Sequence, residues 1–164
     1  MKTLTLALAL TASAAFAQSL PSEHVDVIGT YNPTATPGGS LTGAYSHLLS
    51  QSGTYSFSAV DVTFGSATTT TAKGVSGLVS RVQVATTSGL AQRLTSLMGF
   101  DVYGIGTAGL TTVAGGGTTG FVASGGFLAV HPLKKGWTVD LHARTIAGTG
   151  SPQYVLGLGF GFGK

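Results

Sequence analysis

The C-terminal residues 154–164 alternate between large apolar side chains and glycine. On an extended strand, one face carries Tyr154, Leu156, Leu158, Phe160 and Phe162, and the other carries Val155 followed by Gly157, Gly159, Gly161 and Gly163. Because successive side chains of a strand point to opposite faces, one face is apolar and the other is nearly bare. A strand of a membrane-spanning β-barrel needs this arrangement, with lipid outside and small groups facing a crowded interior. The pattern therefore predicts a lipid-facing strand.

The N terminus carries the three parts of a secretory signal peptide in order. Lys2 provides a positive start, residues 4–10 form a short apolar stretch, and residues 15–17 read Ala-Phe-Ala, which is typical of a cleavage site. The apolar stretch is shorter than the roughly 20 residues that a membrane-spanning helix needs. We expect residues 1–17 to be removed on export and residues 18–164 to form one domain. A retained N-terminal anchor is the alternative.

The composition excludes several kinds of protein. The chain of 164 residues has no cysteine, which rules out disulfide bonds and thiolate metal sites. The formal net charge is +3, and the adjacent pair Lys134 and Lys135 is too small for a nucleic-acid surface, so we expect no nucleic-acid partner. Disordered chains are rich in charge, whereas only 8% of these residues are charged. So few charges cannot easily cover the surface of a soluble protein.

About eight segments have strand character and are separated by turn signals. They are residues 25–31, 41–49, 54–64, 75–86, 100–113, 120–130, 137–146 and the C-terminal stretch described above. The residues between Phe64 and Val75 are rich in serine, threonine and glycine, and we interpret them as a loop. The predicted fold is therefore all-β: a closed antiparallel up-and-down transmembrane β-barrel that follows a cleaved signal peptide.

Residues 88–98 fit this scheme less well. Leu90, Leu94, Leu97 and Met98 recur at helical spacing, with polar residues between them. We expect one or two helical turns in a connection, and an extension of the preceding strand is the alternative.

Charged side chains lie opposite aliphatic ones on four of the segments. Trp137, Val139 and Leu141 share one face of their strand, which we predict to be lipid-facing, and Asp140, His142 and Arg144 share the other. A closed barrel would bring the second kind of face into the lumen, where acids and bases can pair. The predicted lumen charge network consists of Asp26, Asp61, Arg81, Asp140, His142 and Arg144. A solvated sheet face is the alternative, and it would require many more lysines and glutamates.

With these features the chain resembles the small outer-membrane β-barrel family typified by the OmpA transmembrane domain and by OmpX. The resemblance covers residues 18–164 and rests on strand number, alternation, aromatic placement and the glycine-rich last strand. It implies a location in the outer membrane of a diderm bacterium, with outer-membrane lipids and the barrel-insertion machinery as partners and a monomeric state. Members of the family usually end on an aromatic residue, whereas Lys164 occupies that position here and Phe162 precedes it.

Chemical motifs are nearly absent. Residues 104–109 match G-x-G-x-x-G, but neither a helical pattern nor an acidic residue at the expected spacing follows. The histidines lie in separate segments without metal-ligand spacing, so we expect no metal and no cofactor. We also expect no enzymatic activity. The alternative is a lipid-modifying enzyme that would combine His142, Asp140 and a serine.

The predicted role is a membrane-embedded structural or interaction scaffold, because small barrels are usually filled by side chains. One alternative is a narrow porin-like channel or a carrier of a small hydrophobic ligand, since glycines on the inner face would leave free space. Another is a secreted, soluble, self-associating β-protein.

Overall fold

A computed structural model of the protein describes residues 21–32, 38–70, 74, 76–114, 119–148 and 153–164, with the backbone alone at 32, 38, 66–70 and 76–81. The predicted signal peptide, residues 1–17, lies outside this part. The strands are β1 (Glu23–Asn32), β2 (Gly38–Ser50), β3 (Thr54–Thr70), β4 (Ser76–Leu97), β5 (Phe100–Val113), β6 (Thr119–Pro132), β7 (Trp137–Ala147) and β8 (Gln153–Gly163). A short 3-10 turn, η1 (Lys134–Gly136), joins β6 to β7.

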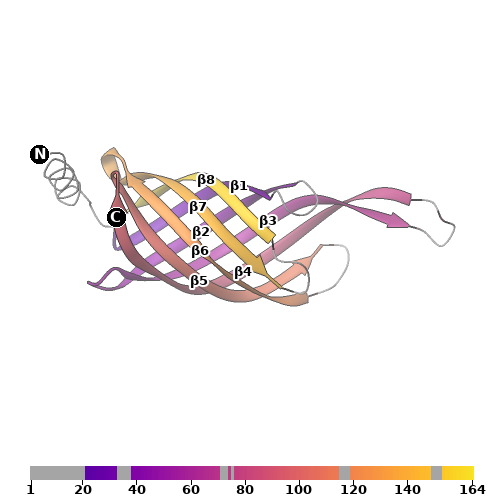
Figure 1. Cartoon of the computed structure of the whole chain (residues 1–164), viewed down its shortest axis with the longest axis horizontal. Coiled ribbons are helices and arrows are strands. Elements are labelled where there is room, and N and C mark those ends of the chain that lie inside the picture. Colours follow the sequence, from indigo (N-terminus) through magenta and orange to yellow (C-terminus); the bar gives the residue numbers. More distant parts are fainter. Residues whose placement is uncertain (1–20, 33–37, 71–73, 75, 115–118, 149–152) are drawn as a thin grey trace, which may run out of the picture.

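The strands form one closed barrel in chain order (Figure 1). Each strand pairs antiparallel with the next, and β1 closes the ring by pairing antiparallel with β8. The prediction of a closed, eight-stranded, antiparallel up-and-down barrel is thereby confirmed. Among the described residues, no helix has the length and apolar character needed to cross a membrane.

Burial alternates along the strands except at bulges, as the pleat of a barrel wall requires. On β1, His24, Asp26 and Ile28 are buried, whereas Val25 and Val27 are each more than half exposed. The side chains of even-numbered residues in this strand therefore point into the barrel and those of odd-numbered residues point outward. The same alternation assigns an inner and an outer face to the other strands.

The predicted helical turns at residues 88–98 are wrong, because β4 continues as a strand to Leu97. The pairing of β4 with β5 shifts by one residue between Arg93 and Thr95, which is a β-bulge at Leu94. An extra residue at a bulge changes which residues of the strand point outward. Leu90 and Leu94 point outward before the shift and Leu97 after it, and each is more than half exposed. Their spacing therefore imitates a helix although the backbone is extended.

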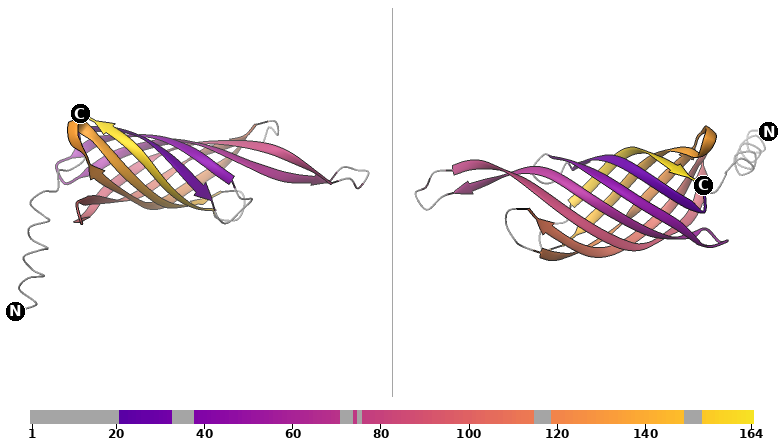
Figure 2. Two further views of the ribbon diagram at one scale, coloured as in Figure 1. Left: turned by 90° about the horizontal axis from the view of Figure 1, so that it is seen from above. Right: turned by 180° about the vertical axis from the view of Figure 1, so that it is seen from behind.

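A second difference concerns the connection between β3 and β4, which was predicted to be a loop from residue 65. The two strands stay paired up to Thr70 and Ser76. Threonine is a good strand former, so a threonine-rich segment can extend a hairpin as readily as form a loop. The pairing with β2 stops at Thr63 and that with β5 stops at Gln83. Residues 65–70 and 76–81 thus form a two-stranded ribbon that projects from the barrel at the end away from the C terminus (Figure 2).

The glycine face of β8 lies directly against β1. A Cβ atom at Gly159 would overlap the carbonyl oxygen of Val27, and one at Gly161 would overlap the ring of His24. Glycine is therefore needed at these positions to let β1 approach closely. The space that these glycines leave is occupied by His24 and Ile28, so it does not widen the lumen as the channel alternative assumed.

Candidate functional site

The inner face of β7 carries a row of polar side chains along the barrel interior. The row consists of Thr138, Asp140, His142 and Arg144, at alternate positions of one strand, and all four are buried. Alternation with Trp137, Val139 and Leu141 places the row inside, because those side chains occupy the opposite face. Polar groups in such a place need partners from other strands to offset the loss of water.

Arg144 has its partners on β2 and β3. Its Nη2 atom contacts Asp61 Oδ1, and the two side chains are 2% and 5% exposed. Thr42 donates a hydrogen bond of 2.6 Å to the same carboxylate oxygen. Strands β7, β3 and β2 are thus joined through the lumen by one arginine, one carboxylate and one hydroxyl. A buried pair of this kind is weak evidence for net stability, but removing one partner is costly.

A second group lies closer to the chain termini. His24 Nε2 is 2.9 Å from Thr138 Oγ1, and that hydroxyl donates to Asp140 Oδ2 at 3.1 Å. Because the hydroxyl proton goes to Asp140, the oxygen of Thr138 accepts a hydrogen bond from His24. The other ring nitrogen, His24 Nδ1, is 3.9 Å from Asp26 Oδ2. The group therefore connects β1 to β7 across the glycines of β8.

A third group was not predicted from the sequence. Arg93 Nη2 lies 2.8 Å from Asp101 Oδ1, and Ser96 donates to the same oxygen. Both Arg93 and Ser96 belong to the segment that was interpreted as helical turns. The bulge at Leu94 breaks the simple alternation, and this hid the fact that both side chains face inward. The sequence of β4 alone carries no signal that places both side chains inward, because the shift depends on the pairing of β4 with β5.

Five of the six predicted lumen residues lie in the described interior. Asp26, Asp61, Asp140, His142 and Arg144 are all buried in the interior. Of the three aspartates, Asp61 lies within salt-bridge distance of Arg144, whereas Asp26 and Asp140 face His24. The side chain of Arg81 lies outside the described part of the structure, so its expected pairing stays a prediction.

Large apolar side chains occupy the interior beside these polar groups. Tyr55, Phe57, Tyr103, Ile28 and Leu128 are each at most 1% exposed and belong to one cluster. They come from β1, β3, β5 and β6, so they meet from different sides of the ring. Tyr55 and Tyr103 pack edge to face with ring centroids 5.6 Å apart. The barrel is filled at the level of this cluster.

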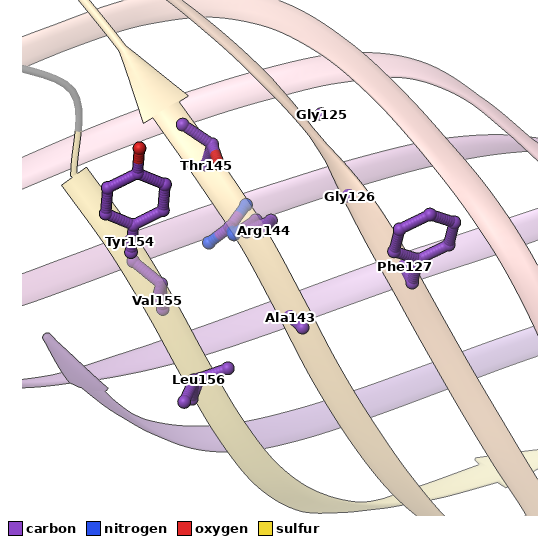
Figure 3. A pocket seen from close by; sticks show the side chains of 9 residues that line it. All are labelled: Gly125, Gly126, Phe127, Ala143, Arg144, Thr145, Tyr154, Val155 and Leu156. Atoms are coloured by element: carbon purple, nitrogen blue, oxygen red, sulfur yellow. The ribbon is translucent and has the colours of Figure 1, made fainter.

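The outer wall is lined with apolar side chains. The predicted lipid-facing residues Tyr154, Leu156, Leu158, Phe160, Phe162, Trp137 and Leu141 are 41–59% exposed, and Val139 is partly exposed. A shallow groove crosses this wall over β6, β7 and β8 (Figure 3). Phe127 of β6 borders the groove on one side and Tyr154 and Leu156 of β8 border it on the other, with Ala143 of β7 between them. Small residues flanked by large ones therefore produce the hollow.

The histidine and acidic side chains of the described interior bear on metal binding and catalysis. In the part of the chain that the structure describes, no three histidine or acidic side chains are grouped as metal ligands would be. Neither ring nitrogen of His142 has a hydrogen-bond partner among these residues. The alternative of a serine–histidine–acid site at His142 and Asp140 would need a serine hydroxyl hydrogen-bonded to His142, and none of the described residues provides one.

The fold and the interior define a class: a closed, eight-stranded up-and-down β-barrel with a filled and partly charged interior. No protein-family model matches the chain, and no curated protein matches it. Membership of the family that the sequence resembles stays a prediction.

Proposed function

We propose that the protein is an exported, integral outer-membrane β-barrel that serves as a structural or interaction scaffold. The outer wall carries this proposal, because every strand contributes at least one large apolar side chain that is more than 40% exposed. Soluble monomers rarely expose continuous apolar surface on this scale, and such surface marks contact with a membrane or a partner. Here all eight strands contribute to the apolar surface, as contact with lipid on every side would require, and the buried charges lie inside.

The filled interior supports a scaffold over a channel. The aromatic and aliphatic cluster around Tyr55 and Tyr103 and the bridge from Arg144 to Asp61 both cross the lumen. Small barrels generally have interiors just wide enough to be filled by side chains. A solute would have to displace tightly packed groups in order to pass.

The projecting ribbon supports an interaction role. Residues 65–70 and 76–81 pair with each other, and none of the described strands pairs with their outer edges. Unpaired strand edges present backbone donors and acceptors to which an extended segment of another protein can add. The ribbon lies at the end of the barrel opposite the C terminus, so it would stand clear of the membrane surface on that side (Figure 2).

Folding should require an amphiphile. We expect the mature chain to gain its β-sheet circular dichroism in detergent micelles or lipid vesicles and to aggregate in plain buffer, because the exposed wall needs an apolar surrounding. Electrophoresis of unheated samples after mixing with vesicles would report the folded fraction. Equal recovery of a monodisperse folded monomer without amphiphile would contradict the proposal and favour the soluble alternative.

Export should remove the first seventeen residues. If Lys2, the apolar residues 4–10 and the Ala-Phe-Ala sequence at 15–17 are a signal peptide, the protein in the cell envelope begins at Gln18. Intact-mass measurement of envelope protein would give this start. Envelope protein that still carries Met1 would show that the N terminus is a retained anchor.

A further inference from the structure

The outward-facing charged side chains gather at one end of the barrel. Among residues with described side chains, the exposed charged groups are Glu23, Lys134, Lys135 and Lys164. Glu23 begins β1, Lys164 follows β8, and the two lysines of η1 join β6 to β7, so all four lie at the end that carries the C terminus (Figure 1). The apolar wall between this end and the ribbon carries no exposed charged side chain in the described residues.

The four charges are not equivalent. Lys164 lies directly across from Glu23, since the backbone N–H of each donates to the carbonyl oxygen of the other. Glu23 also has His47 beside it, with 3.9 Å between His47 Nδ1 and Glu23 Oε1. None of the three lysines has a carboxylate within salt-bridge distance among the described residues. Lys164 has Glu23 as its neighbour on the adjacent strand, whereas the described residues place no acidic neighbour beside Lys134 or Lys135. The turn therefore presents two ammonium groups to which the described part of the chain supplies no counter-charge.

The turn that carries these lysines is tightly built. The Leu133 N–H donates a hydrogen bond of 2.7 Å to the carbonyl oxygen of Trp137, which closes the turn. Lys135 has a positive φ of 63° and Gly136 has one of 80°. A Cβ atom at Gly136 would lie 2.6 Å from the Gly163 carbonyl oxygen, so only glycine lets the turn pack against the end of β8. The two lysines are thus held beside the last residues of that strand.

An aromatic pair lies next to the lysines. The rings of Trp137 and Phe162 pack edge to face with centroids 5.5 Å apart. Trp137 is 52% exposed and Phe162 is 41% exposed, so both rings offer outward apolar surface. Tryptophan concentrates at membrane–water interfaces, because its ring is apolar and its N–H is polar. The pair therefore marks the level at which an apolar wall meets charged groups.

We propose that Lys134, Lys135 and the Trp137–Phe162 pair form a binding site for the headgroup of an anionic phospholipid. The lysine ammonium groups contact the lipid phosphate, and the two rings lie against the glycerol and the first methylene groups of the acyl chains. A free phosphate ion would satisfy the lysines but would make no use of the exposed rings, so a lipid fits this surface better. The inference rests on the proposed membrane location and adds which lipid this end of the barrel selects.

The chain provides its own probe for this site, because Trp137 is its only tryptophan. The full mature protein would be folded into vesicles that contain equal amounts of zwitterionic and anionic phospholipid, with bromine on the acyl chains of one lipid at a time. Brominated lipids in contact with the indole quench its fluorescence. We expect the anionic lipid to be preferred over the zwitterionic lipid at the site by about fivefold or more. Each lysine near an anionic membrane surface contributes about 1 kcal/mol of attraction, which corresponds to a factor of about five.

The variant Lys134→Gln/Lys135→Gln should bring this preference close to one. Lys134→Gln alone and Lys164→Gln remove the same charge from the same end, so they form a matched pair. We expect a clear loss of preference for the first and little change for the second, because Glu23 is the cross-strand neighbour of Lys164 and its negative charge offsets the positive charge of the lysine.

The outcomes separate the two proposals. Failure of every brominated lipid to quench Trp137 would mean that this wall does not contact lipid, and the proposed function itself would fail. Equal quenching by both lipids would leave the membrane location standing and overturn the anionic site. An anionic preference that survives in the double variant, or that falls equally in Lys134→Gln and Lys164→Gln, would show general attraction to the end of the barrel and would also overturn the site.

Discussion

Arg144→Met is expected to lower the free energy of unfolding by about 3–5 kcal/mol, since it leaves the carboxylate of Asp61 buried without its charge partner. Asp61 is buried, and of its contacts with the described residues it would retain the hydrogen bond from Thr42. Urea unfolding in lipid vesicles, followed by circular dichroism, would measure the change. This is the largest single effect that we expect, because the pair lies across the lumen and joins β7 to β3.

The double variant Arg144→Met/Asp61→Asn is the matched control. Asparagine is neutral and keeps an oxygen that accepts the hydrogen bond from Thr42, so no unpaired charge stays in the lumen. We expect most of the lost stability to return, because replacing both members of a buried ion pair is often close to neutral. A loss below about 1 kcal/mol in Arg144→Met would mean that water solvates Asp61 well, and the description of a tightly filled lumen would then be wrong.

Leu158→Arg should cost about 2–4 kcal/mol if its wall faces lipid near the middle of the bilayer. Leu158 pairs with Gly29 and Leu141 near the centres of β1 and β7, and its side chain is exposed. In a soluble barrel the same change at an exposed position would be nearly neutral. The folded fraction and the unfolding midpoint in vesicles would distinguish these cases.

Leu97→Arg makes the same change at another outward leucine, at the end of β4 near the chain termini. Arginine near a membrane interface costs only about 0–1 kcal/mol, so the two variants should differ strongly. Equal losses at Leu97 and Leu158 would contradict the assignment of a membrane-spanning wall. A serine at Gly157 would be a poor control, because its Cβ atom would lie 2.5 Å from the side chain of Thr30.

Alternation was sufficient to predict the barrel and much of its interior. On β1, β3 and β7 no bulge interrupts the described pattern, so the inward positions of Asp26, Asp61 and Arg144 follow from a period of two. Which acid pairs with Arg144 could not follow from the sequence. That choice depends on the stagger between strands that are not neighbours in the chain, and a single strand carries no information about it.

The two errors have physical causes that local patterns do not contain. The shift at Leu94 is read correctly only when the partner strand β5 is known, because a bulge is a property of a pair of strands. The extension of β3 to Thr70 likewise depends on pairing with β4, since threonine-rich segments suit a loop or a strand. The channel alternative assumed free space beside the bare face of β8, and the close approach of β1 that fills this space lies outside the segment itself.

The glycines of β8 also bear on the way in which the chain becomes a ring. Every other pairing joins strands that are consecutive in the chain, whereas closure must bring β1 together with β8, and residues as distant as His24 and Gly163 become partners. Ile28 fits only where β8 offers no side chain. A slip of one residue would turn every side chain of β8 to the other face and set Phe160 or Leu158 against it. The alternating glycines thus allow a single register between the first and last strands. A barrel that begins to close in another register meets a steric clash and cannot complete the pairing of β1 with β8.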